Sequence, residues 1–128
     1  MKTQLPEIFD ENELEVLNRV QANCFRTSIY SDPRDSFLNL AGEIGEFCGK
    51  ISKAYRDYSG LRFDDNGIVA LGNMTVDSIK HELGDIFWQM CDALTWLEFD
   101  LADIVRMNQI KLRSRAERKQ IGGAGDVR

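Results

Sequence analysis

The sequence predicts an all-α protein with four main helices in an antiparallel, bundle-like arrangement. Apolar residues recur at helical spacing in four segments, each segment opens with a capping or acidic residue, and no segment alternates convincingly like a strand. The 128 residues are 43% hydrophobic and 29% charged, as in an ordinary globular protein. Folding at this length buries roughly two-thirds of the extended chain's surface. We therefore expect a single domain over residues 1–128.

The first two helices are indicated by their amino ends and by their apolar stripes. The first is expected from about Asp10 to Thr27, with an acidic amino end that suits the helix dipole. The second is expected from Pro33 to about Arg56, because Asp32 can cap it and proline fits the first helical position. The predicted core residues are Leu14, Leu17, Val20 and Cys24 in the first helix and Phe37, Leu40, Ile44, Phe47 and Ile51 in the second.

The segment from about 57 to 74 interrupts the helical pattern. Gly60, the run Asp-Asp-Asn-Gly at 64–67 and the pair at 72–73 are turn signals around short apolar pieces. We expect an insertion loop there, with room for a brief helix. Thr75 then caps a third helix and Asp100 a fourth. From about 120 to 128 the chain is too glycine-rich for a helix, so we expect a flexible tail.

Composition excludes several classes of protein. The three cysteines are odd in number and widely spaced, which fits neither a disulfide framework nor a zinc site, so we expect buried, unpaired thiols. The net charge of −5 and the pI near 4.9 argue against general nucleic-acid binding. No apolar run approaches the roughly 20 residues of a membrane-spanning helix, and the first residues lack a secretory signal. These features predict a cytoplasmic protein with no membrane or nucleic-acid partner.

Four acidic residues form two pairs with helical spacing. Glu43 and Glu46 lie three apart on the second predicted helix, and Glu82 and Asp85 lie three apart on the third. Each pair shares one helix face, so two packed helices would bring four carboxylates to one point. Such oxygen ligands suit magnesium, with phosphate oxygens and water completing its shell. The alternative is a solvated helix face, on which Glu46 and Lys50 form an ordinary exposed pair.

A polyphosphate is the ligand that would fit this acidic site. Metal ions would reverse the local field and polarise the phosphoryl oxygens, and a water deprotonated with the help of a neighbouring carboxylate would attack phosphorus. On the fourth helix, Asn108, Lys111 and Arg115 stand where the apolar stripe would continue, and their amide, ammonium and guanidinium groups suit phosphate oxygens. The alternative is a helix end that leaves the core, where the dipole favours cations.

Two other kinds of site are excluded by the residues present. Di-iron helical bundles use Glu-x-x-His from two helices, whereas His81 is the one histidine of this chain. Phosphate recognition by a Walker loop is absent too, because no Gly-x-x-x-x-Gly-Lys-Ser/Thr run occurs.

At these motifs the sequence resembles the MazG-like, all-α nucleoside triphosphate pyrophosphohydrolases. Residues 40–46 (Leu-Ala-Gly-Glu-Ile-Gly-Glu) and 82–86 (Glu-Leu-Gly-Asp-Ile) are similar to the two signature blocks of that family, and 108–115 is similar to its Asn-x-x-Lys element. The similarity runs from about Gln21 to the carboxyl terminus. It implies an Mg²⁺-dependent enzyme, with Mn²⁺ as a substitute, that hydrolyses the bond between the α- and β-phosphates of (deoxy)nucleoside triphosphates.

The resemblance also implies roles for particular residues. The implied metal ligands are Glu43, Glu46, Glu82 and Asp85, and the implied catalytic residues are Glu43 and Glu46, one of which would steer the water. The implied substrate-binding residues are Asn108, Lys111 and Arg115, assisted by Lys50 and Lys53. Members of this family are dimers or tetramers, so the resemblance implies a homodimer or homotetramer with a subunit interface near the site.

One departure from the family pattern affects substrate preference. The stretch 47–81 between the motifs is longer than in compact members, with 57–74 as the apparent excess, which could cover the base pocket or extend an interface. Base preference is therefore the property that transfers least from the family. Deoxynucleotides are favoured as substrates on the resemblance alone. Two other functions stay open: a helical interaction or regulatory module of the same fold without turnover, and a hydrolase of alarmones or modified nucleotides.

Overall fold

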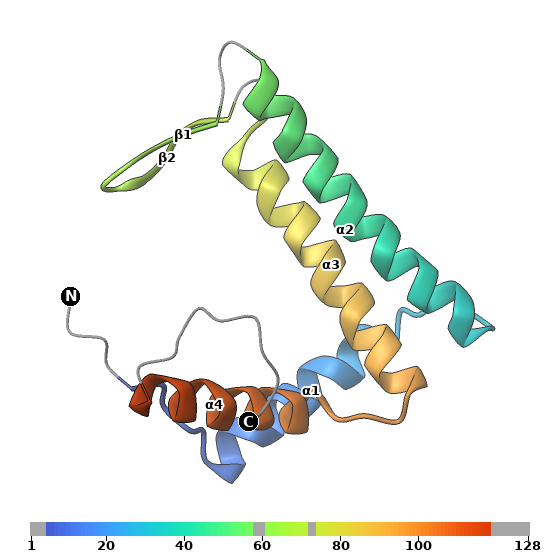
Figure 1. Cartoon of the computed structure of the whole chain (residues 1–128). Helices are drawn as coiled ribbons and strands as arrows, with labels where there is room; N and C mark the ends of the chain where they lie inside the picture. Colours follow the sequence, from blue (N-terminus) through green and yellow to red (C-terminus); the bar gives the residue numbers. More distant parts are fainter. Residues whose placement is uncertain (1–4, 58–60, 72–73, 119–128) are drawn as a thin grey trace.

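The computed structural model describes residues 5–57, 61–71 and 74–118 and confirms an all-α fold built on four helices (Figure 1). The predicted tail from about 120 to 128 lies outside the described residues. The helices are α1 (Glu11–Phe25), α2 (Pro33–Arg56), α3 (Val76–Trp96) and α4 (Leu101–Glu117), and a short hairpin of β1 (Leu61–Asp64) and β2 (Gly67–Leu71) connects α2 to α3.

The helices form two antiparallel pairs rather than one closed bundle. The long helices α2 and α3 lie side by side, while α1 packs on both α3 and α4 (Figure 1). The α1–α4 pair therefore lies across one end of the α2–α3 pair, and the β-hairpin lies at the other end. Within the described ranges, none of these helices combines the length and the apolar composition that crossing a membrane requires.

All four predicted helix starts agree with the structure to within one residue, and at three of them the predicted residue caps the helix. Asp10, Asp32 and Thr75 occupy the N-cap positions of α1, α2 and α3. Each side chain accepts a hydrogen bond from a first-turn backbone N–H, at 2.9, 2.8 and 3.1 Å respectively. These bonds satisfy amides that the helix itself leaves without partners, which is why the chain enters each helix at these residues.

The start of α4 is capped differently from the prediction. Asp100 occupies the N-cap position, but its side chain makes no capping hydrogen bond. Instead, the Leu101 N–H donates to Oε1 of Gln21 (2.6 Å) and the Ala102 N–H donates to Oδ1 of Asn18 (3.1 Å). Two side chains of α1 therefore satisfy the first amides of α4 and fix where α4 begins.

The insertion between α2 and α3 holds a β-hairpin, so the expectation of a loop with a brief helix is wrong. The strands pair antiparallel, with Arg62 opposite Ala70 and Asp64 opposite Gly67. Oδ1 of Asp64 accepts a hydrogen bond from the Asn66 N–H (2.7 Å), and Gly67 has a φ of 119°, a conformation that glycine tolerates and other residues rarely adopt. The turn chemistry of the chain thus closes a tight hairpin.

A buried polar network joins α2 to α3 near α1. Oγ of Ser36 donates to Oδ2 of Asp92 (2.5 Å), and Nε2 of Gln89 donates to the Ser36 carbonyl (3.0 Å). The Tyr30 hydroxyl donates to Oε1 of Gln89 (2.8 Å). Ser36, Gln89 and Asp92 are each 0% exposed. Leaving such a buried group without its partner costs about 1–3 kcal/mol, so the Ser36 network, as we call these four residues, stabilises one alignment of the two helices.

Some side chains that the sequence assigns to the core are exposed in the single chain. Phe37 and Ile44 are 37% and 45% exposed, although periodicity placed both on the core face of α2. The three cysteines are free, as expected, and burial raises the pKa of the Cys91 thiol to about 12. Cys48 is exposed, which contradicts the prediction that all three are buried. The helix pair therefore leaves part of its apolar surface uncovered.

Candidate metal and phosphate site

Polar residues occupy the interface between α2 and α3, where a helix pair normally buries apolar ones. A seven-residue repeat keeps a set of side chains facing the partner helix. We call this set the polar seam; it consists of Ser36, Glu43 and Lys50 on α2 and of Ser78, Glu82, Gln89 and Asp92 on α3. The Ser36 network fills one end of the seam, and the predicted acids lie at its middle.

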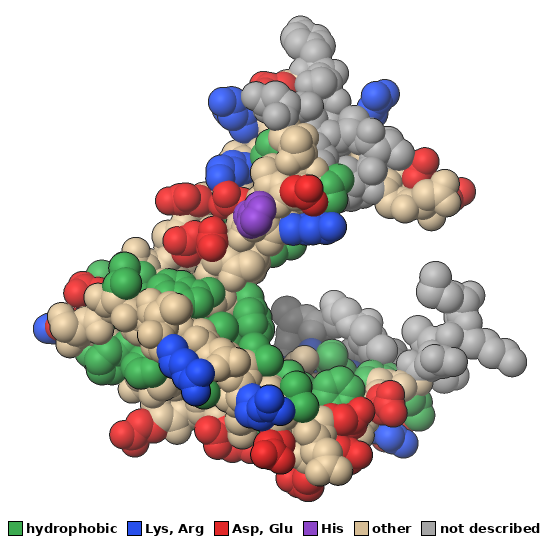
Figure 2. Space-filling view, turned by 180° about the vertical axis from the view of Figure 1, so that it is seen from behind, with side chains coloured by type: hydrophobic (Ala, Val, Ile, Leu, Met, Phe, Trp, Pro, Cys, Tyr) green, Lys and Arg blue, Asp and Glu red, His purple; other side chains and the backbone are tan. Residues whose placement is uncertain are grey.

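The structure brings three of the four predicted acids together. Glu43, Glu46 and Glu82 each place a carboxylate oxygen within 4.8 Å of the other two. Asp85 is exposed and lies outside this group of three, although its negative charge acts on Glu43. Seen from behind, acidic side chains gather over the α2–α3 pair with basic side chains beside them (Figure 2). Two helices thus supply a cluster of carboxylate oxygens at one point of the surface.

The neighbouring acids raise the affinity of Glu43 for a proton. The pKa of Glu43 is raised above that of an ordinary glutamate, first by desolvation and then by the negative charges of the other three acids. Among the described residues, no histidine or cysteine joins this group, and His81 is exposed. A donor set made only of carboxylate oxygens suits hard divalent ions such as Mg²⁺ and Mn²⁺. The residues present therefore fit such an ion.

Lys50 contacts the cluster across the seam. Its ammonium donates a hydrogen bond to Oε1 of Glu82 and forms an ion pair with that carboxylate. This bond raises the pKa of Lys50 above the ordinary lysine value. The alternative of an exposed pair between Glu46 and Lys50 is not what the structure shows, because Lys50 pairs across the seam with α3. The lysine supplies positive charge to the acids from within the chain.

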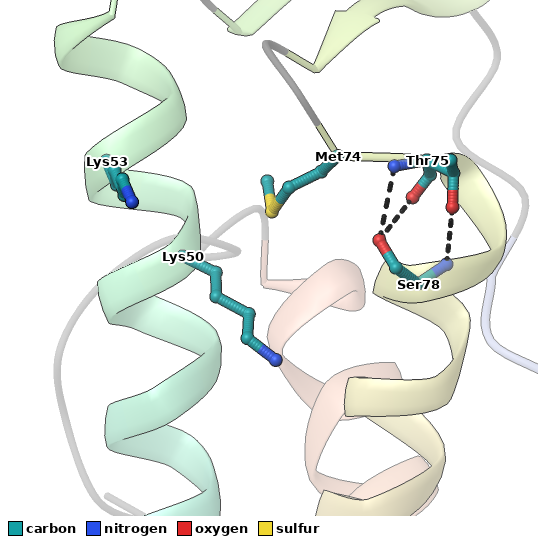
Figure 3. A pocket seen from close by; sticks show the side chains of 5 residues that line it. All are labelled: Lys50, Lys53, Met74, Thr75 and Ser78. Atoms are coloured by element: carbon teal, nitrogen blue, oxygen red, sulfur yellow. Dashed lines mark hydrogen bonds between the residues drawn. The ribbon is translucent and has the colours of Figure 1, made fainter.

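A cavity of about 310 Å³ lies beside the acids, at the start of α3. Lys50 and Lys53 reach it from α2, Thr75 and Ser78 reach it from the first turn of α3, and Met74 lies between them (Figure 3). The Ser78 N–H donates to Oγ1 of Thr75 (3.1 Å), and Oγ of Ser78 donates to the Thr75 carbonyl (2.8 Å). We call this cavity the lysine pocket. The sequence predicted only a capping role for Thr75 and no ligand-binding role for Met74 or Ser78.

The structure does not bring Asn108, Lys111 and Arg115 to the acids within one chain. All three lie on α4, which packs on α1 away from the middle of the α2–α3 pair (Figure 1). Asn108 is exposed, while Lys111 and Arg115 are half-buried. Of the five predicted substrate-binding residues, a single chain therefore places Lys50 at the acids and Lys53 at the lysine pocket.

Comparisons with known proteins bear on the same region. The family model described as the MazG nucleotide pyrophosphohydrolase domain matches residues 32–119, a range that contains both acid pairs, the lysine pocket and the polar residues of α4. The Gene 37 protein of Mycobacterium phage L5 is 33% identical over 91 residues, which cover 71% of this chain and 72% of that protein. No solved structure matches the chain.

Proposed function

The chain belongs to the MazG nucleotide pyrophosphohydrolase family, and we propose that it is an Mg²⁺-dependent enzyme that hydrolyses (deoxy)nucleoside triphosphates to monophosphate and pyrophosphate. One observation carries this proposal: Glu43, Glu46 and Glu82 meet within 4.8 Å on the seam between two helices. We further propose that the enzyme acts in the cytoplasm on nucleotide pools, without a nucleic-acid or membrane partner.

The proposed roles of the residues follow from their charge and position. Glu43, Glu46 and Glu82 hold the metal, and Asp85 binds at the edge of the same site. When bound, Mg²⁺ neutralises the acids and polarises phosphoryl oxygens; Mn²⁺ substitutes for it. Glu43 accepts the proton of the attacking water as the general base.

The proposed reaction is a single displacement at phosphorus. The water oxygen forms a bond to phosphorus as its proton passes to Glu43. The bond between that phosphorus and the oxygen bridging the α- and β-phosphates breaks, and this oxygen leaves with the electron pair. The products are a nucleoside monophosphate and pyrophosphate. Lys50 and Lys53 stabilise the negative charge of the phosphates from α2.

We propose that the enzyme is a homodimer or homotetramer in which a second copy supplies Asn108, Lys111 and Arg115. Within one chain these residues lie on α4, apart from the acids (Figure 1). A second copy could place its α4 beside the exposed α2–α3 seam. The uncovered apolar side chains Phe37 and Ile44 on α2 support such packing, because a soluble monomer rarely leaves its core positions open.

The arrangement of the helices supports the same proposal, because open helix pairs gain a core when two of them pack together.

A substrate panel tests the proposed activity. Each of the eight common nucleoside triphosphates and a guanosine tetraphosphate alarmone is incubated with Mg²⁺, with Mn²⁺ and with chelator, and pyrophosphate release is measured. We expect metal-dependent release from at least one deoxynucleotide. Glu43→Gln should lower kcat by at least about 100-fold, since it removes a metal ligand and the proton acceptor together. Glu15→Gln makes the same change at an exposed position of α1 and should leave kcat unchanged.

Each other outcome of this panel favours a named alternative. Turnover confined to the alarmone or to modified nucleotides would support a hydrolase of those compounds. If no nucleotide is hydrolysed by folded protein, the enzyme proposal is wrong, and a helical interaction module of the same fold takes its place.

A further inference from the structure

We propose that the lysine pocket binds the β- and γ-phosphates of the substrate, and so the pyrophosphate product. This inference rests on the proposed function, which places the metal at the acids. It adds Thr75, Ser78 and Met74 to the substrate-binding residues and gives the substrate a direction along the polar seam.

The charges of the pocket suit the more anionic end of a triphosphate. Lys50 and Lys53 both line the cavity, and Lys50 also contacts Glu82, so the pocket is continuous with the acids (Figure 3). Among the described residues, Lys53 has no ion-pair partner and is exposed. A phosphate oxygen would give it one. A cation bound at Glu82 would also release Lys50 toward the pocket, because the carboxylate would no longer depend on the lysine for its counter-charge.

The opposite wall supplies hydrogen-bond donors rather than a second charge. Oγ1 of Thr75 accepts a bond from the Ser78 N–H, which leaves the Thr75 hydroxyl hydrogen free to donate to a ligand. The wall is also the amino end of the 21-residue helix α3, where the helix dipole adds to the attraction of the two lysines for an anion. Lysines on one side and a hydroxyl on the other are typical of phosphate-binding cavities.

The seam itself determines the direction. From the acids it runs one way to the lysine pocket and the other way to the Ser36 network, whose Ser36, Gln89 and Asp92 are 0% exposed. Within the seam, phosphates can therefore extend from the metal site toward the pocket but not toward the Ser36 network. At about 310 Å³ the cavity is at the small end of the range for ligand pockets, about 300–1,000 Å³, and it has room for two phosphoryl groups.

Binding of the two products separates this inference from the activity. Inorganic pyrophosphate in the presence of Mg²⁺, and separately dAMP, dCMP, dGMP and dTMP, are titrated into the full chain by calorimetry. We expect Lys53→Met to weaken pyrophosphate binding about tenfold, the usual effect of losing one charge-assisted hydrogen bond. For each monophosphate that binds the wild type, the affinity of the Lys53→Met variant should stay within about twofold of the wild-type affinity. Arg19→Met removes one exposed positive charge from α1 and should change neither affinity.

A second variant tests the same pocket by volume. Met74→Trp fills the cavity without changing charge and should also weaken pyrophosphate binding, with thermal melting used to confirm that both variants are folded. The inference is wrong if pyrophosphate binds neither the wild type nor any variant, if both variants bind it like wild type, or if monophosphate affinity falls equally. Lys53-dependent pyrophosphate binding without hydrolysis of any nucleotide would keep the pocket assignment and reject the proposed function.

Discussion

The negative charge of Glu43 is unfavourable in the metal-free fold. It is desolvated and surrounded by three other acids, and both effects raise its pKa. In the unfolded chain these effects are absent, so the folded state binds a proton at Glu43 more tightly than the unfolded state does. Above its folded pKa the ionised group therefore destabilises the metal-free protein, and this penalty disappears as the pH falls through that pKa.

At the residue scale, we predict that Glu43→Gln stabilises the metal-free protein at neutral pH. The gain should be about 0.5 kcal/mol, as expected for removing a like-charge pair three residues apart on a helix. It should shrink as the pH is lowered toward the raised pKa, because the wild-type carboxyl then becomes neutral itself. Urea unfolding with chelator, at a series of pH values, measures the difference. A variant less stable than wild type at neutral pH would contradict this explanation.

The acids could be predicted from the sequence, whereas the lysine pocket could not. Residues three apart on a helix share a face whatever the tertiary structure, so Glu43 and Glu46 needed no further information. Which residues of α3 face Lys50 depends on how the two helices align, and the sequence alone does not determine that alignment. Ser78 was therefore missed, although the seven-residue spacing from Asp85 to Ser78 matches that from Glu43 to Lys50.

At the scale of elements, the start of α4 depends on a side chain from another helix. Gln21 is 6% exposed and accepts a hydrogen bond from the Leu101 N–H. Its amide donates to the Phe99 carbonyl (2.8 Å) and to Oγ1 of Thr95, near the end of α3 (3.0 Å). One buried side chain thus links α1, α3 and α4. Local capping rules identified Asp100 because they consider only neighbours in sequence.

We predict that Gln21→Leu destabilises the protein by about 1–3 kcal/mol, since it leaves buried backbone groups at the α3–α4 turn without partners. Hydrogen exchange should increase first in the early residues of α4. Asn23→Leu, at an exposed position of the same helix, serves as the matched control and should change stability by less than about 0.5 kcal/mol. Equal stability of the two variants would show that α4 is positioned by other contacts.

The β-hairpin shows how a local signal can be overlooked. Asn66-Gly67 is a strong hairpin signal, and the structure places these residues at the turn. The flanking runs are short and do not alternate clearly, so the turn residues were assigned to a loop. Helix boundaries were easier to predict, because proline and capping residues act within a few positions of the boundary itself.

At the scale of the whole molecule, the predicted site residues are divided between parts of the fold that do not meet in one chain. The acids and Lys50 lie on the α2–α3 pair, and Lys111 lies on α4. Sequence periodicity predicted both groups, yet it could not place them relative to each other. Periodicity also assigned Ile44 to the core without showing whether the core belongs to one chain or is shared by two.

We predict that mixtures of two inactive variants regain activity if copies complete one another's sites. Glu43→Gln and Lys111→Ala are each expected to be inactive. In a mixed dimer, one site receives wild-type acids from one chain and wild-type Lys111 from the other. Random exchange of subunits should restore about a quarter of wild-type turnover, because half of the dimers are mixed and each has one intact site of two.

The matched control mixes Glu43→Gln with Glu82→Gln. Both acids come from the same helix pair of one chain, so every site in that mixture carries a defect and no turnover should return. Recovery in neither mixture would mean that Lys111 acts within its own chain, and a Lys111→Ala variant that is active alone would mean that Lys111 has no role in turnover. Sedimentation of each mixture checks that subunits have exchanged.

The Ser36 network also affects the acid cluster, which lies about two helical turns away along α2. Ser36, Glu43 and Lys50 are spaced by one heptad, so a slip of α2 along α3 by that distance would preserve the pattern of facing positions while pairing each group with the wrong opponent. In the observed alignment Ser36 hydrogen-bonds both Asp92 and Gln89 in the buried interior, and such a slip would break these bonds. The buried groups of the Ser36 network therefore determine which carboxylates of α2 and α3 lie opposite one another, although these groups are not part of the acid cluster.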